Sequence, residues 1–580
     1  MTDARILLHP AFPLLLGAIV TAALPPRKRI YFSPVFTFLS LICLFAVPAG
    51  SLMTLPFLNG MELLFFQSTT LSRLMCFFTL VVVFCSQVYS LGREKGREGC
   101  WSLVYAAAAC GVLMAGDFFT LVLWWEAMSV GAVFLIWSRR DPKASKAGFR
   151  YLMIHFLSGN LLLMGAVLYA SQGITQLGPL EPGGAAYWLV LAGVGISAGM
   201  IPFHSWIPDA YPEATIGGSA ILSGVTTKVA AITLLRLFSG ESFLLGMGIV
   251  MAFWGVLYAL RENNIRRLLS YHIISQLGLI IAAIGIGTPM AKDAAVALTI
   301  GNILYKGLLY MSAGSVLYAT GRQKLTEVGN LFKAMPITSV FFFIGSLAIA
   351  GVPGLMGFAV KPLVVSSAVY SYQPVAELLL YAAGIGTFLS IPLKLGGHML
   401  WGTHPAPPIL RKPKTAMYVG MTLLTVFILA IGFVPGLLYS QLPWQEEVHF
   451  SLYTADHILS EVEFLLAAWL AYRLMNPLLH PKDFISLDLD WFYRVPLPRF
   501  FLALSRFANF VRLSVWKGIL VLVRALSRFV RNPVSYFMKP IDGGDSTEEY
   551  CADKYRLPVG DGALLILMVF AVVYFYVTIF

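Results

Sequence analysis

Long apolar runs separated by short polar stretches dominate this chain. A helix of about 20 apolar residues crosses a hydrocarbon core of about 30 Å, so runs of this length predict membrane spans. The pattern predicts sixteen of them and an all-α polytopic membrane fold. They cover residues 6–24, 30–50, 73–91, 100–115, 117–137, 149–170, 186–206, 215–237, 242–260, 267–286, 291–318, 337–356, 375–400, 415–438, 459–475 and 561–580.

Basic residues between the spans predict their orientation. Positive loops stay on the inner side of a membrane. With the N-terminus outside, the loops at 27–29, 93–97, 139–146, 261–267, 322–333 and 411–414 are inner loops, and each carries Lys or Arg. The intervening loops hold acids instead, among them Glu181 and Glu241. We therefore expect a multi-pass protein of the cell inner membrane with both termini on the outer, periplasmic side.

Composition narrows the class of protein. The chain is 58% hydrophobic and 12% charged, about half the charge of an ordinary soluble protein. Its net charge of +12 follows from the inner loops, so we expect lipid and no nucleic acid as a partner. The sequence holds no nucleotide-binding glycine fingerprint and no iron–sulfur ligand run, and its six cysteines lack metal spacing. We expect no cofactor, no metal and no catalytic site of its own.

The C-terminal part departs from the simple pattern of spans. Between Arg494 and Lys539 the sequence has nine Lys or Arg residues and no Asp or Glu. The basic residues recur near helical spacing, and apolar residues fill the other face. This predicts an amphipathic helix on the inner membrane surface, followed by an anchor span at 561–580. A lipid anchor and a clamp on neighbouring subunits both remain open.

Four ionisable residues lie inside apolar spans: Glu126, Lys228, Lys306 and Lys394. A Lys or Asp at the centre of a spanning helix costs about 2.5–3.5 kcal/mol on insertion scales. Such a residue therefore needs a partner, water or a function. Four in one chain indicate a charge relay through the membrane.

Several motifs accompany these residues. Pro202-Phe-His204-Ser-Trp-Ile-Pro-Asp-Ala leads to Ser219-Ala-Ile-Leu-Ser-Gly and Lys228, and its Gly and Pro residues predict an interrupted helix. It resembles PFHxWLPDAHxEAPTxxSALLxGxxxK of the antiporter-like proteins: the large proton-pumping subunits of respiratory complex I, related hydrogenase subunits and Mrp-type Na⁺/H⁺ antiporters. Further matches are a Glu126 helix, Arg266-Arg-Leu-Leu-Ser-Tyr-His-Ile-Ile-Ser-Gln-Leu-Gly (KRLLAYSSISQLG), Asn302-Ile-Leu-Tyr-Lys306-Gly-Leu-Leu (HALFKALL) and Gly351-Val-Pro-Gly-Leu-Met-Gly-Phe-Ala-Val-Lys361 (AGLPPLxGFxxKF).

The resemblance covers about residues 60–440 and implies two inverted five-helix repeats, each with a broken helix. It implies that Lys228 serves one half-channel and Lys394 the other. Glu126 would pair with Lys228, and Lys306 would lie on the central axis. A carboxylate beside an ammonium keeps both charged, and separating them lets the lysine lose its proton.

Three positions depart from the family pattern. Asn302 stands where the family has a His, Arg266 where it has a Lys, and Ser197 where it has a Lys before the Pro-Phe-His motif. Arg scarcely deprotonates, so Arg266 can fix a field without relaying a proton. His204 is a candidate for proton access at the inner side.

Two residues keep two interpretations each. His155 is either a satisfied histidine of the bundle or a proton carrier. Lys361, near an outer helix end, either reaches the outer surface or supports the relay.

The sequence thus predicts N-terminal spans at 1–95, an antiporter-like core at 96–440 and a C-terminal extension at 441–580. The favoured function is a proton-translocating subunit of a multisubunit membrane complex that holds no redox centre itself. Its partners are other integral membrane subunits, as in a complex of the NADH:quinone oxidoreductase or hydrogenase type. An autonomous Na⁺/H⁺ antiporter and a structural subunit with a decayed channel remain alternatives, and the coupling ion, H⁺ or Na⁺, stays open.

Overall fold

The computed structural model describes residues 9–57, 62–91, 98–402, 404–447, 450–482, 487–531 and 559–579. The chain divides into two units, Met1–Asp490 and Trp491–Phe580. The predictions made for the basic loop at 93–97, for residues 532–558 and for the two chain ends lie outside the described residues.

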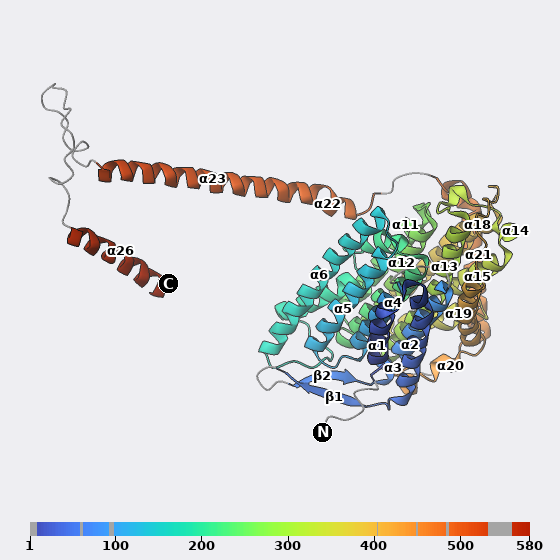
Figure 1. Cartoon of the computed structure of the whole chain (residues 1–580). Helices are drawn as coiled ribbons and strands as arrows, with labels where there is room; N and C mark the ends of the chain where they lie inside the picture. The colour runs from blue at the N-terminus through green and yellow to red at the C-terminus, as the bar shows by residue number, and fades with distance from the viewer. Residues whose placement is uncertain are drawn as a thin grey trace. The chain divides into compact units, whose positions relative to one another are not determined.

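The first unit is a helical bundle with one small hairpin. Its first helices along the chain are α1 (Ala11–Ala23), α2 (Pro26–Ala46), α3 (Thr70–Ser90), α4 (Glu98–Met114), α5 (Phe118–Trp137), α6 (Pro142–Ser171), α7 (Gly184–Ser197), α8 (Trp206–Ala210), η3 (Tyr211–Glu213), α9 (Ile216–Gly224) and α10 (Thr226–Leu237). Next come α11 (Ser242–Arg261), α12 (Ile265–Ile286), α13 (Pro289–Thr320), η4 (Leu325–Glu327), α14 (Leu331–Ala334), α15 (Pro336–Ala350), α16 (Met356–Tyr370), α17 (Pro374–Phe388), the π-helical segment η5 (Leu389–Gly396), α18 (Gly397–Trp401), α19 (Thr415–Phe433), α20 (Gly436–Tyr439), η6 (Gln445–Glu447) and α21 (Ala455–Leu479). Strands β1 (Leu52–Pro56) and β2 (Glu62–Gln67) pair antiparallel at one end of the bundle (Figure 1).

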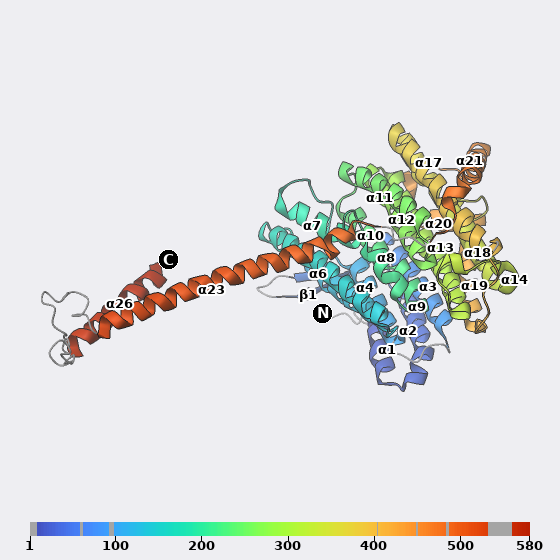
Figure 2. The same ribbon diagram turned by 90° about the horizontal axis from the view of Figure 1, so that it is seen from above.

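Helix α13 forms the middle of this bundle. It packs against α3, α9, α12, α15, α16 and α19. Figures 1 and 2 both show it next to α12 and α19. The apolar window of α13 is fully buried (100%), whereas that of α11 is only 39% buried. A helix that is apolar all round and buried all round belongs to the interior of a bundle, and one exposed face suits lipid.

Local sequence signals set the ends of the central helices. Asn264 accepts hydrogen bonds from the first backbone N–H groups of α12, and Thr288 caps α13 by accepting from Ala291 N. Both helices end at glycines with positive φ, Gly287 (75°) and Gly321 (70°). These residues satisfy the free N–H groups at the start of a helix and supply the left-handed turn that ends it.

Helices α15 and α16 follow one another along α13. Gly345 of α15 lies against Leu309 of α13, and Gly301 of α13 lies against Met356 and Val360 of α16. The five residues between them include two glycines with positive φ, so the chain breaks without turning back. The sequence predicted one span at 337–356 and a loop after it; it missed α16 because a lysine and Pro362 interrupt the apolar run.

The first unit and α26 together make this a multi-pass membrane protein. Among the described residues, eleven helices are long and apolar enough to cross a membrane, and five shorter apolar helices accompany them. Helix α21 covers the predicted span at 459–475, but it carries Glu461, Glu463 and Arg473 and is not one of the eleven.

The second unit contains two long helices, α23 (Pro496–Arg531) and α26 (Val559–Ile579); the short α22 (Asp490–Arg494) begins at the boundary between the units. The predicted amphipathic segment is one continuous helix as far as Arg531. Arg506, Lys517 and Arg524 are spaced by close to whole helical turns and share one face. Helix α26 covers the predicted anchor as far as Ile579, and its apolar window has no buried residue.

Candidate functional site

Lys228 lies at a break between two helices. Helix α9 ends at Gly224 and α10 begins at Thr226, with Val225 at φ −116° and ψ −72° between them. The break leaves carbonyls of α9 without helical partners. The Lys228 ammonium donates to Ser223 O at 2.7 Å and to Thr227 Oγ1 at 3.3 Å, and its side chain is 1% exposed. The interrupted helix therefore solvates the buried lysine with its own backbone.

Lys306 lies in the middle of α13 and is fully buried. Its ammonium donates to Leu269 O of α12 at 3.1 Å. One turn earlier is Asn302, whose side-chain oxygen and nitrogen have no partner within the described protein. His272 of α12 lies close enough for the charge of Lys306 to act on it, and neither of its ring nitrogens has a described partner.

Sequence reasoning did not single out His272. The sequence did contain a signal for this residue, because His272 stands where the KRLLAYSSISQLG pattern has a Ser. In this chain Asn302 on α13 stands at the position of the family's central histidine. The histidine near Lys306 is instead His272, on the neighbouring helix α12.

Lys394 lies in the π-helical segment η5 and is 1% exposed. Its ammonium donates to three carbonyls at the C-terminal end of α11: Leu260 O at 2.5 Å, Glu262 O at 2.9 Å and Ala259 O at 3.3 Å. A helix C-terminus is the negative end of the helix dipole, so it stabilises an ammonium.

Lys361 is buried as well, at 7% exposure. Its ammonium donates to Ala350 O, the last carbonyl of α15, at 3.1 Å. Of the two interpretations left open by the sequence, the structure does not support a side chain that reaches the outer surface. Lys361 uses the break between α15 and α16 as Lys228 uses the break between α9 and α10.

The structure does not bring Glu126 and Lys228 into contact. No described hydrogen bond or ion pair joins them, and Glu126 Oε2 has no described partner. Glu126 is partly buried on α5 and packs against Gly159 of α6. A Cβ atom at position 159 would lie 1.6 Å from Glu126 Oε1, so any other residue there would force this carboxylate to move.

A chain of polar side chains lies near Glu126. Trp125 Nε1 donates to Ser158 Oγ at 3.3 Å, and Ser158 Oγ is 2.8 Å from Ser197 Oγ. Ser197 Oγ is in turn 3.0 Å from His155 Nδ1. Ser197, at the position of a family lysine, therefore contacts a buried histidine.

From His155 the polar chain continues toward Lys228. The His155 ring stacks on Tyr151 at 4.0 Å, and Tyr151 Oη is 3.2 Å from Thr226 Oγ1. Thr226 also bonds to Tyr105 and lies two residues before Lys228. These groups connect α5, α6, α7 and α10, although the stack between His155 and Tyr151 is not a hydrogen bond.

His204 does not lie among the lysines. It is fully buried and contacts a residue 284 positions later, Asp488, with Nε2 3.1 Å from Oδ1. Tyr271 Oη donates to the same carboxylate at 2.9 Å. The sequence did not predict this contact, because no pattern links two segments so far apart.

Arg266 holds the loop before α9. It is 2% exposed and donates to Ala214 O at 3.0 Å, to Thr215 O at 3.3 Å and to the Ser219 hydroxyl. Two ion pairs secure the same region, Arg150 with Asp209 at 2.7 Å and Arg139 with Glu213 at 3.0 Å. Asp209 and Glu213 thus hold the loop before α9 in place through their ion pairs. Within the described residues, no cluster of three or more His, Cys, Asp or Glu side chains has the arrangement of a metal site.

Part of this chain is similar to known proteins. Residues 115–390 match the family described as NADH:quinone oxidoreductase/Mrp antiporter, transmembrane region. This segment includes the broken helix with Lys228, the Glu126 helix and the Lys306 helix. The match covers just under half of the chain, and over these residues the chain is similar to that family.

Several curated relatives share this region. The chain is 30% identical over 318 residues to hydrogenase-4 component B of Escherichia coli, covering 48% of this chain and 47% of the relative. It is 34% identical over 286 residues to formate hydrogenlyase subunit 3 of the same organism, covering 44% and 46%. The D subunit of the Na⁺/H⁺ antiporter of Alkalihalophilus pseudofirmus is 28% identical, covering 55% and 69%. The chain thus spans about half the length of the first two relatives.

Solved structures share the fold. A chain of the Mrp complex from Dietzia sp. has a TM-score of 0.69 at 23% identity, covering 80% of this chain and 100% of its own length. A chain of the archaeal membrane-bound sulfane sulfur reductase has a TM-score of 0.68 at 20% identity, covering 98% and 99%. A chain of respiratory complex I from Thermus thermophilus has a TM-score of 0.63 at 22% identity, covering 74% and 98%. At these identities the likeness establishes the shared fold alone.

Proposed function

We propose that this chain is a proton-translocating subunit of a multisubunit membrane complex. The observation that carries the proposal is the surroundings of the buried lysines. Lys228 and Lys361 donate to backbone carbonyls beside helix breaks, and Lys394 lies in a π-helical segment and donates to backbone carbonyls of α11 and its C-cap. An amine held by hydrogen bonds to neutral carbonyls needs little rearrangement to lose or gain a proton, whereas a tight ion pair would fix its charge.

Glu126, His155, Lys228, Lys306 and Lys394 carry the proton in this proposal. His155 takes the part of the family lysine that is Ser197 here, because the two side chains are hydrogen-bonded. His272 and Lys306 form the central step between the two halves. Arg266 stays charged and sets the field around the loop.

The proposal also assigns a role to each region of the chain. Residues 96–440 form the translocating core, residues 1–95 support it, and residues 441–580 attach the chain to partner subunits. The basic face of α23 lies on the inner membrane surface or on a partner, where each basic residue near anionic lipid contributes about 1 kcal/mol. Both termini face outward in the inner membrane.

The test starts from the native complex. A tag on this chain allows the complex to be purified and its subunits to be identified by mass spectrometry. Redox subunits among them favour a redox-driven pump of the quinone-reductase or hydrogenase type, and small antiporter subunits favour the Mrp type. Recovery of this chain alone would overturn the multisubunit proposal and favour an autonomous antiporter.

Transport is then measured in vesicles. The purified complex, driven by its own redox reaction or by an imposed ion gradient, is expected to acidify one side, as reported by a pH-sensitive dye. The triple variant Lys228→Gln, Lys306→Gln, Lys394→Gln should assemble and not transport. Unchanged transport by this variant would assign the lysines a structural part only. A requirement for Na⁺ in the wild-type complex would identify cation exchange.

A further inference from the structure

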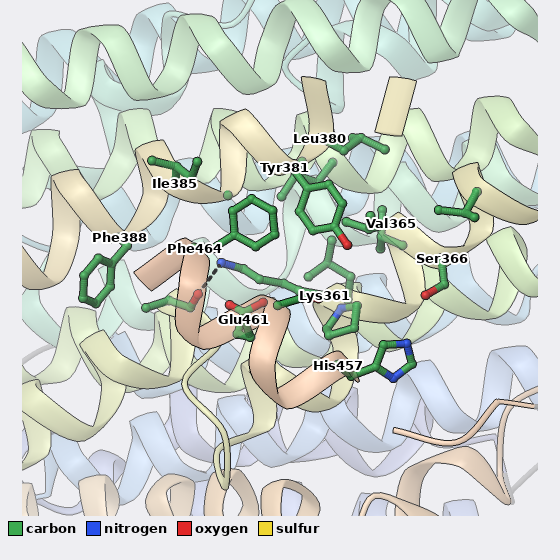
Figure 3. A pocket seen from close by; sticks show the side chains of 18 of the residues that line it. Lys361, Val365, Ser366, Leu380, Tyr381, Ile385, Phe388, His457, Glu461 and Phe464 are labelled. Carbon is green, nitrogen blue, oxygen red and sulfur yellow. Dashed lines mark hydrogen bonds between the residues drawn. The ribbon is translucent and has the colours of Figure 1, made fainter. Parts of the chain in front are cut away.

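A cavity of about 230 Å³ lies beside Lys361, between α16, α17 and α21 (Figure 3). Apolar side chains form most of its wall, among them Leu380, Phe388 and Phe464. Its polar lining includes Lys361, Ser366, Tyr381, His457, Ser460 and Glu461. Helix α21 supplies three of these polar groups, and α21 lies beyond the matched region 115–390. The cavity is therefore shared between the family core and the extension that follows it.

Glu461 is the acidic side chain next to Lys361. Figure 3 shows its carboxylate turned toward the Lys361 side chain across the cavity wall. Gly351, at the break between α15 and α16, lies between them: a Cβ atom there would be 2.7 Å from Glu461 Oε1 and 3.4 Å from Lys361 Cδ. Gly351 has a φ of +98°, which also favours glycine. Among the described contacts no hydrogen bond or ion pair joins the two side chains, and the break leaves open space between them.

The other charged and titratable groups around this pair come from five helices. They are His457 on α21, Tyr370 on α16, Tyr381 and Glu377 on α17, His272 on α12 and Lys306 on α13. The acid whose charge acts on Lys361 is Glu461. Glu463, two residues later on α21, is exposed and does not line the cavity.

This geometry suits proton exchange. A carboxylate and an ammonium in apolar surroundings stabilise each other's charge, and a single proton transfer neutralises both. Lys361 already donates to Ala350 O, so its nitrogen keeps a hydrogen-bond acceptor after it becomes neutral. A cavity of about 230 Å³ has room for several water molecules, each taking about 30 Å³ in the liquid.

We propose that Glu461 accepts the proton that Lys361 releases and passes it to water in the cavity, so that α21 completes the second half of the path. In the first step an N–H bond of the ammonium breaks and an O–H bond forms on the carboxylate, which leaves a neutral amine and a carboxylic acid. In the second step the acid gives the same proton to a water molecule and becomes a carboxylate again. The inference rests on the proposed proton transport and adds a residue outside the family core.

The first test does not depend on transport. Dicyclohexylcarbodiimide modifies protonated carboxyl groups in apolar surroundings, and mass spectrometry of the purified complex locates the adduct. Glu461 should be modified at pH 7–8, and Glu463 should not. The variant Lys361→Gln removes the positive charge, so modification of Glu461 should become several-fold faster. An unchanged rate in Lys361→Gln would overturn the pairing, whether or not the complex pumps protons.

Transport measurements then test the role of the pair. Glu461→Gln should lower the proton transport rate at least tenfold, whereas Glu463→Gln should leave it unchanged. The double variant Lys361→Gln, Glu461→Gln buries no unpaired charge, so it should assemble and stay inactive even if a single variant is unstable. Full transport by the double variant would reject Glu461 as the proton acceptor.

Sodium provides the last arm of the test. Protection of Glu461 from the carbodiimide by Na⁺, but not by choline at equal ionic strength, would show that the carboxylate binds a metal cation. That result would overturn the assignment of Glu461 as a proton acceptor from Lys361. Equal labelling in both salts is the expected result.

Discussion

His204 and Asp488 join the broken-helix motif of the core to the segment that follows α21. Nε2 of the histidine lies 3.1 Å and 3.2 Å from the two carboxylate oxygens of Asp488. Tyr271 Oη and Leu489 N donate to the same carboxylate, at 2.9 Å and 2.7 Å. A second bond lies next to it, because Tyr258 Oη donates to Leu487 O at 2.8 Å. The residues just before α22 are thus fastened to the motif that carries the family signature.

Loss of this carboxylate should release the segment. We expect Asp488→Ala to raise the rate of hydrogen exchange in residues 487–494 several-fold, because a buried hydrogen bond that is lost costs about 1–3 kcal/mol. Hydrogen exchange of the purified complex with mass spectrometry measures this. Asp456→Asn, an exposed acid at the start of α21, is the control and should change nothing. Equal exchange in Asp488→Ala and wild type would show that other contacts hold the segment.

The same contact has a predictable pH dependence. Burial by itself raises the pKa of Asp488, but the hydrogen bonds from His204, Leu489 and Tyr271 outweigh it and hold the pKa below its usual value. A carboxyl whose pKa is lowered by folding adds stability above its unfolded pKa, about 3.9, and loses it as the pH falls further. Relative to the intrinsic exchange rate at each pH, hydrogen exchange of residues 487–494 should therefore be insensitive to this group above about pH 5 and should rise in more acidic solution.

Glu126 can be tested both by removing its carboxylate and by displacing it. Glu126→Ala should abolish or strongly reduce proton transport while the complex still assembles. Gly159→Ala should have a similar effect, because the new methyl group would lie 1.6 Å from Glu126 Oε1 and must displace the carboxylate. Gly246→Ala on α11 is the matched control, since nothing lies within 4 Å of its added Cβ atom. Normal transport in Gly159→Ala would mean that the position of the carboxylate does not matter.

Substitutions of the half-channel lysines distinguish a role as a fixed charge from a role in proton release. Lys228→Ala and Lys394→Ala should each reduce transport at least tenfold. Lys228→Arg keeps a positive charge that does not dissociate, so it should assemble well and still fail to transport. Dye-based proton uptake in vesicles measures all three. Full activity of Lys228→Arg would assign Lys228 a purely electrostatic part.

His155 is expected to be the titrating group near Ser197. His155→Gln keeps hydrogen-bonding capacity but cannot take up a proton in this range, so transport should fall several-fold. Ser197→Ala removes only the hydrogen bond of 3.0 Å and should have a smaller effect. A loss in Ser197→Ala as large as that in His155→Gln would indicate that the pair acts through packing. Thermal stability of each complex, measured in parallel, controls for misfolding.

The tail helix allows a topology test. Cysteines introduced at Ser505 or Ser527, both on the exposed helix α23, should react with impermeant reagents only from the inner side. Deletion of residues 494–580 should reduce the yield of the assembled complex. The deletion leaves the residues of the proton path in place, because they all precede residue 494. Reactivity from outside would overturn the orientation, and an unchanged yield would leave α23 as a lipid anchor only.

Sequence reasoning located most of the helices and the ionisable residues within them, because long apolar runs and rare buried charges are local signals. It missed α16, since Lys361 and Pro362 break the apolar pattern on which a span prediction depends. It did not foresee the contact of Asp488 with His204, 284 positions away, or the position of Glu461 opposite Lys361, 100 positions away. Such partners depend on how helices pack, and one sequence without an alignment does not encode that packing in a readable period.

The carbonyl partners of the buried lysines limit what ordinary mutagenesis can detect. Ser223, Leu260, Leu269 and Ala350 bind the ammonium groups through main-chain oxygens, which every substituted residue would still possess. A side-chain scan of these positions would leave the contacts intact and report them as tolerant. Replacing the following amide with an ester would weaken the acceptor itself, so backbone chemistry, rather than the choice of side chain, is the means to alter how strongly each lysine is held.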